Sequence, residues 1–195
     1  EIDDVEFNEG VFTNRATNKS VTIQDVAKAA SAPANIPKGM EPGLIATAVY
    51  DNRATNYPNG CHVCELEIDP ETGHVEMCKY TVVDDVGTVM NPLLLKGQIR
   101  GGVAQGVGQI LKEDIQFDHE TGQLLTGSFM DYAMPRAIDF SNIDVTSNPS
   151  PTPTNPLGVK GAGEAGCVGA MPAVANAVVD ALSPLGIRHF EMPAT

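Results

Sequence analysis

The sequence has no tryptophan, few aromatic residues and little positive charge. Aromatic residues make up 5% of the 195 residues, and 12 Lys and Arg stand against 25 Asp and Glu, for a formal net charge of −13. A phosphate backbone requires clustered basic side chains, and single-stranded bases require aromatic platforms. The negative charge also opposes binding to an anionic membrane surface. We therefore expect neither nucleic acid nor membrane as a partner.

Long apolar runs are also missing. No uninterrupted run reaches the roughly 18 residues that a membrane-spanning helix needs, so the sequence predicts no membrane span. No signal peptide opens the chain, which predicts a cytoplasmic location. The first residue is Glu1 rather than Met, and the chain stops at Thr195 without a recognisable end. We therefore expect a fragment of a longer protein.

Cysteine is sparse, with residues only at 61, 64, 78 and 167. Cys61 and Cys64 have the spacing of half a zinc site, but the second pair that such a site needs is missing. Both fall in a stretch with strand character, where residues three apart point to opposite faces. The cysteines are interpreted as free thiols, with no disulfide and no metal site.

Hydrophobic periodicity and turn residues predict strands and helices without regular alternation. A hairpin is expected around Asn8–Gly10, and a second antiparallel pair around the turn Asp69–Gly73. The expected strands of the larger sheet are 44–50, 61–68 and 75–83, and the expected helices are 23–30, 92–112 and 168–182. This order predicts one α+β domain over residues 1–195, in which a mixed or antiparallel sheet packs with a Gly-rich helix and a buried C-terminal helix.

The helix expected at 92–112 has an unusual interior. Asn91 is a favourable N-cap and Pro92 occupies the first helical position, where proline is preferred. One predicted face carries almost no side chains: Gly97, Gly101, Ala104 and Gly108. Each internal glycine costs about 1 kcal/mol relative to alanine. This face therefore predicts the close approach of another element.

Residues 161–166 read Gly-Ala-Gly-Glu-Ala-Gly, which matches the GxGxxG pattern of dinucleotide-binding folds. That pattern follows an apolar strand, whereas a proline-rich stretch precedes it here, which argues against nicotinamide or flavin binding. The segment does place Glu164 among small residues at a helix N-terminus, where unpaired amides favour an anion. Glu164 is thus a candidate general base. The alternative, a glutamate that only complements the helix end, is favoured when spacing alone is considered.

Four motifs occur in a recognisable order: Asp84–Pro92, Gly97–Gly108, Gly127–Pro135 and Asn155–Gly166. Together they resemble the C-terminal part of the large subunit of molybdenum hydroxylases, the xanthine oxidase family, and within it aerobic carbon monoxide dehydrogenase. The resemblance implies an oxidoreductase that oxidises carbon monoxide, an aldehyde or an N-heterocycle with water as the oxygen source. It also implies molybdenum bound to molybdopterin cytosine dinucleotide, and electron transfer to an iron–sulfur small subunit and an FAD-containing medium subunit.

The same resemblance assigns residues. Glu164 would be the active-site base, and the residues in contact with the cofactor or holding its loop would be Asp85, Thr88, Asn91, Gln98, Gln105, Lys160, Gly161 and Gly163. The substrate loop and the first half of the cofactor cradle would belong to the rest of the large subunit. We therefore expect this chain alone to be inactive and to self-associate through exposed surface. The alternative hypothesis is a non-catalytic assembly module.

Overall fold

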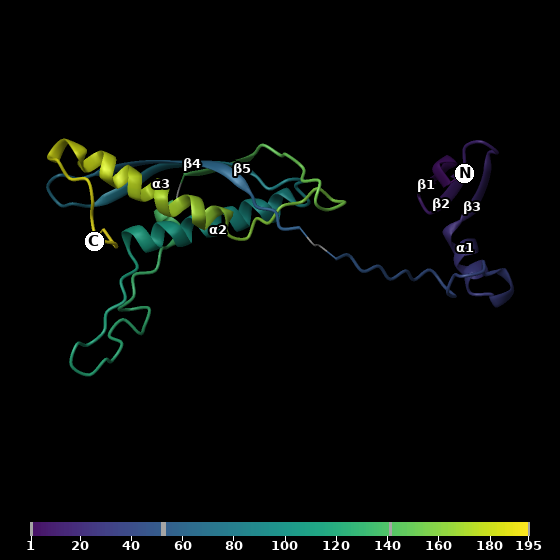
Figure 1. The fold of residues 1–195 in the computed structure, drawn as a ribbon, viewed down its shortest axis with the longest axis horizontal. Helices are drawn as coiled ribbons and strands as arrows, with labels where there is room; N and C mark the ends of the chain where they lie inside the picture. The colour runs from purple at the N-terminus through teal and green to yellow at the C-terminus, as the bar shows by residue number, and fades with distance from the viewer. Residues whose placement is uncertain (1, 52–53, 141, 195) are drawn as a thin grey trace. The chain divides into compact units, whose positions relative to one another are not determined.

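The computed structural model describes residues 2–51, 54–140 and 142–194, and the chain divides into two compact units, 1–51 and 52–195. Each unit has its own three-stranded sheet (Figure 1). The observed architecture is α+β, as predicted. The single domain expected over the whole chain stays a prediction.

The first unit is an antiparallel sheet followed by a short helix. Its elements are η1 (Ile2–Asp4), β1 (Val5–Asn8), β2 (Val11–Asn14), β3 (Lys19–Thr22), α1 (Ile23–Ala30) and η2 (Pro33–Asn35). The predicted hairpin forms, because Glu9 and Gly10 both adopt the positive φ angles, 46° and 83°, that a tight hairpin turn needs. Thr22 caps α1 by accepting a hydrogen bond from the Asp25 amide.

The strand expected at 44–50 does not form. The segment lies in neither sheet, and the side chains of Ile45 and Val49 are exposed. An apolar run becomes a strand only when a neighbouring strand completes its backbone hydrogen bonds. The sequence pattern reflects the apolar character of this segment. It does not indicate whether a neighbouring strand is available to pair with it.

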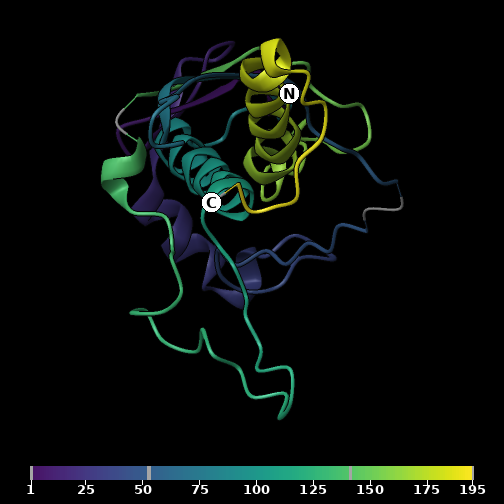
Figure 2. The ribbon, with the colours of Figure 1, turned by 90° about the vertical axis from the view of Figure 1, so that its left-hand side faces the viewer.

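The second unit packs two helices against one mixed sheet. Its elements are β4 (Asn59–Ile68), β5 (Val75–Asp85), α2 (Pro92–Leu111), η3 (Ala137–Phe140), β6 (Ile143–Ser147), α3 (Ala165–Leu182) and η4 (Ser183–Leu185). β5 is central, antiparallel to β4 and parallel to β6. Figures 1 and 2 show α2 and α3 side by side. Tyr80 and Val82 of β5 are fully buried in the core that these helices share.

Glycines bring α2 and α3 into close contact, but they are not the glycines that the sequence indicated. A Cβ atom at Gly166 would overlap the carbonyl oxygen of Ile99, and one at Gly102 would lie 2.8 Å from the Cys167 nitrogen. Gly97 and Gly101, by contrast, have nothing within 4 Å of that position. The predicted close approach therefore occurs, but on the face of α2 that includes Gly102. Gly166 of α3 packs against this face.

The C-terminal helix, predicted to be buried, is buried on one face only. Its buried residues are Gly166, Ala170, Val174 and Val178. Val168 and Pro172 are exposed, because the described chain places α2 and β4 against this helix and nothing on its outer side. Ala165–Leu185 is long and apolar enough to cross a membrane by length and composition alone, a test that a helix packed in a core also passes.

Two adjacent glycines of α2 provide a matched test of the helix contact. We expect Gly102→Ala to lower the free energy of unfolding by about 1–3 kcal/mol, because the methyl group has no room against α3. Gly101→Ala should raise it by about 0.5–1 kcal/mol, because its site is open. Urea unfolding of both variants measures the difference. Equal stabilities would contradict the packing described.

Candidate functional site

The carboxylate of Asp85, the last residue of β5, joins three segments of the chain. Its Oδ1 accepts hydrogen bonds from the backbone amides of Gly87 and Ser150, both at 2.8 Å. Its Oδ2 accepts a bond from the Lys160 ammonium at 2.5 Å. The Lys160 bond, together with these amides, lowers the pKa of Asp85 to about 2. The group therefore stays ionised and holds the segments together at neutral pH.

The segment around Lys160 is further held by backbone pairing with the residues after β5. The Lys160 amide donates to the Val86 carbonyl at 2.8 Å, and the Thr88 amide donates to the Gly158 carbonyl at 2.9 Å. Gly158 has a φ angle of 67°, which favours glycine at this turn. Asp85, Thr88 and Lys160, three predicted site residues, thus lie together at the end of β5.

The predicted Gly-rich loop, residues 161–163, runs from Lys160 to the start of α3 and is open on one side. Gln98 of α2 fixes its far end by donating to the Gly163 carbonyl at 2.8 Å. Within the described chain, the amides of residues 161–164 donate no hydrogen bond, and a Cβ at Gly161 or Gly163 would meet nothing within 4 Å. Consecutive free amides next to a helix N-terminus form a favourable site for anionic oxygen atoms.

Glu164 occupies the N-cap position of α3, but its carboxylate does not cap the helix. Its side chain is exposed and makes no hydrogen bond to the amides of the first turn. A carboxylate near a helix N-terminus complements the helix dipole even without such a bond. Because it makes no such bond, the carboxylate is available to another group.

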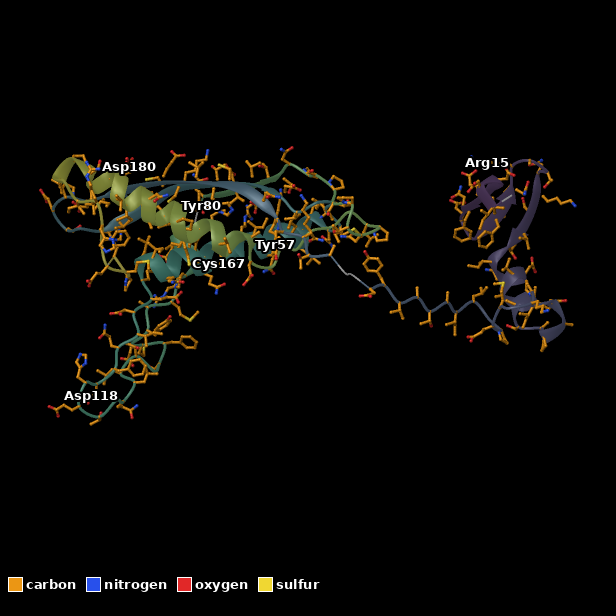
Figure 3. All side chains as sticks on the ribbon, in the orientation of Figure 1. Arg15, Tyr57, Tyr80, Asp118, Cys167 and Asp180 are labelled. Carbon is orange, nitrogen blue, oxygen red and sulfur yellow. The ribbon has the colours of Figure 1, made fainter. Side chains whose placement is uncertain are left out.

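Glu164 lines a pocket of about 360 Å³ between the start of β4 and the first turns of α3. The lining is mostly apolar or small, including Tyr57, Pro58 and Val168. Tyr57 and the start of α3, marked by Cys167, are labelled in Figure 3. The pocket is also lined by His62 and Asp84, which were not among the predicted site residues. A histidine at an inward position of β4 is the sequence signal that could have indicated them.

Two predicted residues stand apart from this cluster. Asn91 is used in capping α2, where its Oδ1 accepts from the Leu93 and Leu94 amides at 3.1 Å each. Gln105 is exposed and lies about 10 Å further along α2 than Gln98, at 1.5 Å per residue. The structure therefore brings together Asp85, Thr88, Gln98, Lys160, Gly161, Gly163 and Glu164.

The sequence profile of the molybdopterin cofactor-binding domain matches residues 1–141. The chain belongs to this family. It is 41% identical over 181 residues to the nicotine 6-hydroxylase large subunit of Paenarthrobacter nicotinovorans, covering 92% of this chain and 22% of that protein. It is 37% identical over 159 residues to the carbon monoxide dehydrogenase large chain of Hydrogenophaga pseudoflava, covering 82% of this chain and 20% of that protein.

The crystal structure of quinoline 2-oxidoreductase from Pseudomonas putida 86 matches with a TM-score of 0.86 at 35% identity, over all of this chain and 25% of that one. The predicted relationship to molybdenum-hydroxylase large subunits is therefore confirmed, and so is the α+β fold. The chain spans roughly a quarter of the length of these relatives.

The open loop fits a molybdopterin cofactor in two respects. Molybdopterin carries an anionic phosphate, whose oxygen atoms can accept hydrogen bonds from the free amides of residues 161–164. The missing Cβ atoms of Gly161 and Gly163 leave space for a large group to reach those amides. Among the described residues, no group of three His, Cys, Asp or Glu is placed to hold a metal ion.

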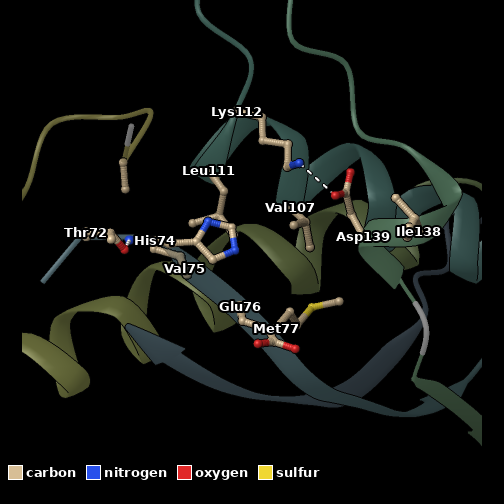
Figure 4. A pocket seen from close by; sticks show the side chains of 12 residues that line it. Thr72, His74, Val75, Glu76, Met77, Val107, Leu111, Lys112, Ile138 and Asp139 are labelled. Carbon is tan, nitrogen blue, oxygen red and sulfur yellow. Dashed lines mark hydrogen bonds and ion pairs between the residues drawn. The ribbon is translucent and has the colours of Figure 1, made fainter. Parts of the chain in front are cut away.

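A second hollow, of about 660 Å³, lies at the other end of α2 and contains none of the predicted residues. Its wall includes His74, Met77 and the ion pair of Lys112 with Asp139, whose atoms are 2.8 Å apart (Figure 4). The four cysteines are free thiols and do not contribute to either hollow. Burial raises the pKa of Cys64 to about 11, so this thiol stays protonated.

The Asp85 junction predicts a pH-dependent stability. Asp85→Asn leaves Lys160 without an ionised partner, so at pH 7 we expect a loss of about 1–3 kcal/mol. The pKa of Asp85 is about 2 in the folded protein and about 3.9 unfolded. Its stabilisation is therefore complete above about pH 5 and lost as the pH falls toward 2. Thermal unfolding of both proteins from pH 7 to pH 2 should show converging stabilities; a constant difference would contradict this role.

Proposed function

We propose that this chain is the part of a molybdenum hydroxylase large subunit that carries the active-site base and one side of the cofactor site, with Glu164 as the base. The observation that carries the proposal is the placement of Glu164. Its unbonded carboxylate lies in a pocket with apolar walls, directly after a loop with four free amides. A general base must be free to reach a proton at the reacting atom, and this carboxylate is free.

The cofactor would be held by the amides of residues 161–164, with Thr88 and Gln98 nearby. We propose the cytosine dinucleotide form, in line with the resemblance to the bacterial three-subunit enzymes. When bound, the molybdenum cofactor supplies two-electron redox chemistry and activates an oxygen derived from water. Lys160 and Asp85 keep the loop in place, because each satisfies the other's charge.

Glu164 would accept, at a carboxylate oxygen, a proton from a donor group that enters the pocket it lines. The carboxylate is exposed and makes no cap bond, so it is free to accept this proton. The apolar walls of the pocket strengthen the interaction of the carboxylate with a nearby donor, since they exclude part of the water.

The names of the related proteins support a proposal for the substrate and the partner subunits. Their names denote oxidation of nicotine, quinoline or carbon monoxide, and two are named as a large subunit or large chain. We propose an enzyme that acts on carbon monoxide, an aldehyde or an N-heterocycle, is located in the cytoplasm, and requires the rest of its large subunit. An iron–sulfur small subunit and an FAD-containing medium subunit would accept its electrons.

The alternative is a non-catalytic assembly module. One observation favours it: Asp85, Gln98 and Lys160 all bond within the chain, so a structural role accounts for them. It does not account for the unbonded Glu164 carboxylate or the free amides before it.

Glu164→Gln in the full-length enzyme separates the two hypotheses. We expect turnover to fall by about three orders of magnitude or more, because the amide cannot accept the proton. Molybdenum content should remain at the wild-type level, since the backbone amides of the loop are unchanged. Glu120→Gln, at an exposed turn far along the sequence, is the control and should keep wild-type turnover. Normal turnover in Glu164→Gln would remove this residue from the base role.

The isolated 195-residue chain should not retain the cofactor. It supplies one side of the proposed site only, so we expect far less than one molybdenum per chain and no hydroxylase activity. Elemental analysis and acid-released cytidine nucleotide after reconstitution measure this directly. One molybdenum bound per isolated chain would show that the cradle is complete without the rest of the subunit.

A further inference from the structure

A buried polar pair lies beneath the pocket that Glu164 lines. His62 of β4 and Asp84 of β5 have side chains that are 6% and 3% exposed. His62 Nε2 lies 3.3 Å from Asp84 Oδ1, and His62 Nδ1 lies 2.9 Å from the Tyr80 hydroxyl. Among the described residues, nothing bonds to Asp84 Oδ2. The carboxylate therefore depends on His62 as its single side-chain partner.

Two glycines make room for this pair. Gly60 lies opposite Asp84 in the strand register, and a Cβ atom there would overlap Asp84 Oδ1. Gly169 of α3 faces the His62 ring, and a Cβ at this glycine would be almost equally close to three atoms of the ring. Equal distances mean that the imidazole lies flat against the helix backbone. The pair thus fills the space between both strands and the second turn of α3.

The position of Glu164 depends on how α3 is seated. The carboxylate makes no cap bond of its own, so it follows the helix backbone. That backbone rests on α2 through Gly166 and on His62 through Gly169, two and five residues after Glu164. A shift of the imidazole would therefore move the first turns of α3 and the carboxylate with them.

Consecutive residues of β5 then hold both ends of the loop. Neighbouring residues of a strand point to opposite faces. Asp85 bonds to Lys160 before the loop, and Asp84 bonds to His62, whose ring packs against the helix that follows the loop. One strand end thereby fixes both the cofactor-facing amides and the proposed base.

The pair is costly to keep for stability alone. A buried carboxylate with one long hydrogen bond and one unpaired oxygen is disfavoured relative to apolar side chains of similar size. We propose that His62 and Asp84 are positioning residues for Glu164: their hydrogen bond sets the seat of α3 and so the placement of the base. The inference rests on the proposed function, in which Glu164 is that base.

Variants of His62 in the full-length enzyme, assembled with its partner subunits, test this role. His62→Phe keeps a flat ring against Gly169 but removes both hydrogen bonds, and we expect kcat to fall at least about tenfold. KM and molybdenum content should stay near wild type, because the loop and its amides are retained. His62→Gln restores a donor for Asp84 and should recover part of kcat. Amide hydrogen exchange in residues 161–168 should increase in His62→Phe.

Two further variants cover the chance that His62→Phe does not fold. Gly169→Ala keeps both residues of the pair but displaces the His62 ring, so it should also lower kcat. Asn176→Ala, on the exposed face of α3, is the matched control and should behave as wild type. Wild-type kcat in Gly169→Ala or in folded His62→Phe, or a loss that only follows molybdenum content, would overturn the positioning role.

Glu164→Gln measured in the same series separates the two proposals. If Glu164→Gln is inactive while the His62 and Gly169 variants keep full kcat, the positioning role fails and the proposed base stands. If Glu164→Gln keeps full turnover, the proposed function fails, and the positioning role fails with it.

Discussion

The contact between Asp85 and Lys160 fixes the part of the structure on which the proposed site depends. Together with the backbone bonds of residues 86–88 with 158–160, it holds the chain after the proline-rich segment at the end of β5. The ion pair anchors the start of the loop, and the bond from Gln98 to the Gly163 carbonyl anchors its end. Residues 161–163 can therefore keep a defined position even though their amides make no bond within the described chain.

A second constraint is the absence of side chains where α2 meets α3. Gly102, Gly106 and Gly166 let the two helix backbones approach closely. Successive positions of α2 meet successive positions of α3, so the two helices run in the same direction. Gln98 can therefore reach the carbonyl of Gly163 from the neighbouring helix. Larger residues at these positions would separate the helices and remove one anchor of the loop.

Local chemistry could be predicted from the sequence where a few adjacent residues determine the structure. The cap at Asn91 and the turn at Asp69–Gly73 both form as expected, because each depends on bonds within a few residues. The motif order also indicated the family correctly. Features that depend on distant partners were missed or misplaced.

Three cases show the physical reason. The segment 44–50 is apolar but has no place in a sheet, and periodicity does not report the partner. The predicted contact face of α2 includes Gly101, whereas the contact itself is at Gly102, because Gly166 of α3 packs there. His62 and Asp84 are 22 residues apart and meet only through the β4–β5 register. The roles of the site residues stay predictions, because those roles are contacts with a cofactor, whereas the described contacts are all within the chain.

The most direct test of the account is a crystal structure of the full-length subunit with its cofactor. The account predicts that amides of residues 161–164 donate hydrogen bonds to the cofactor and that the Glu164 carboxylate faces the molybdenum. It would be contradicted by a cofactor bound away from this loop, or by a Glu164 carboxylate that points away from the metal.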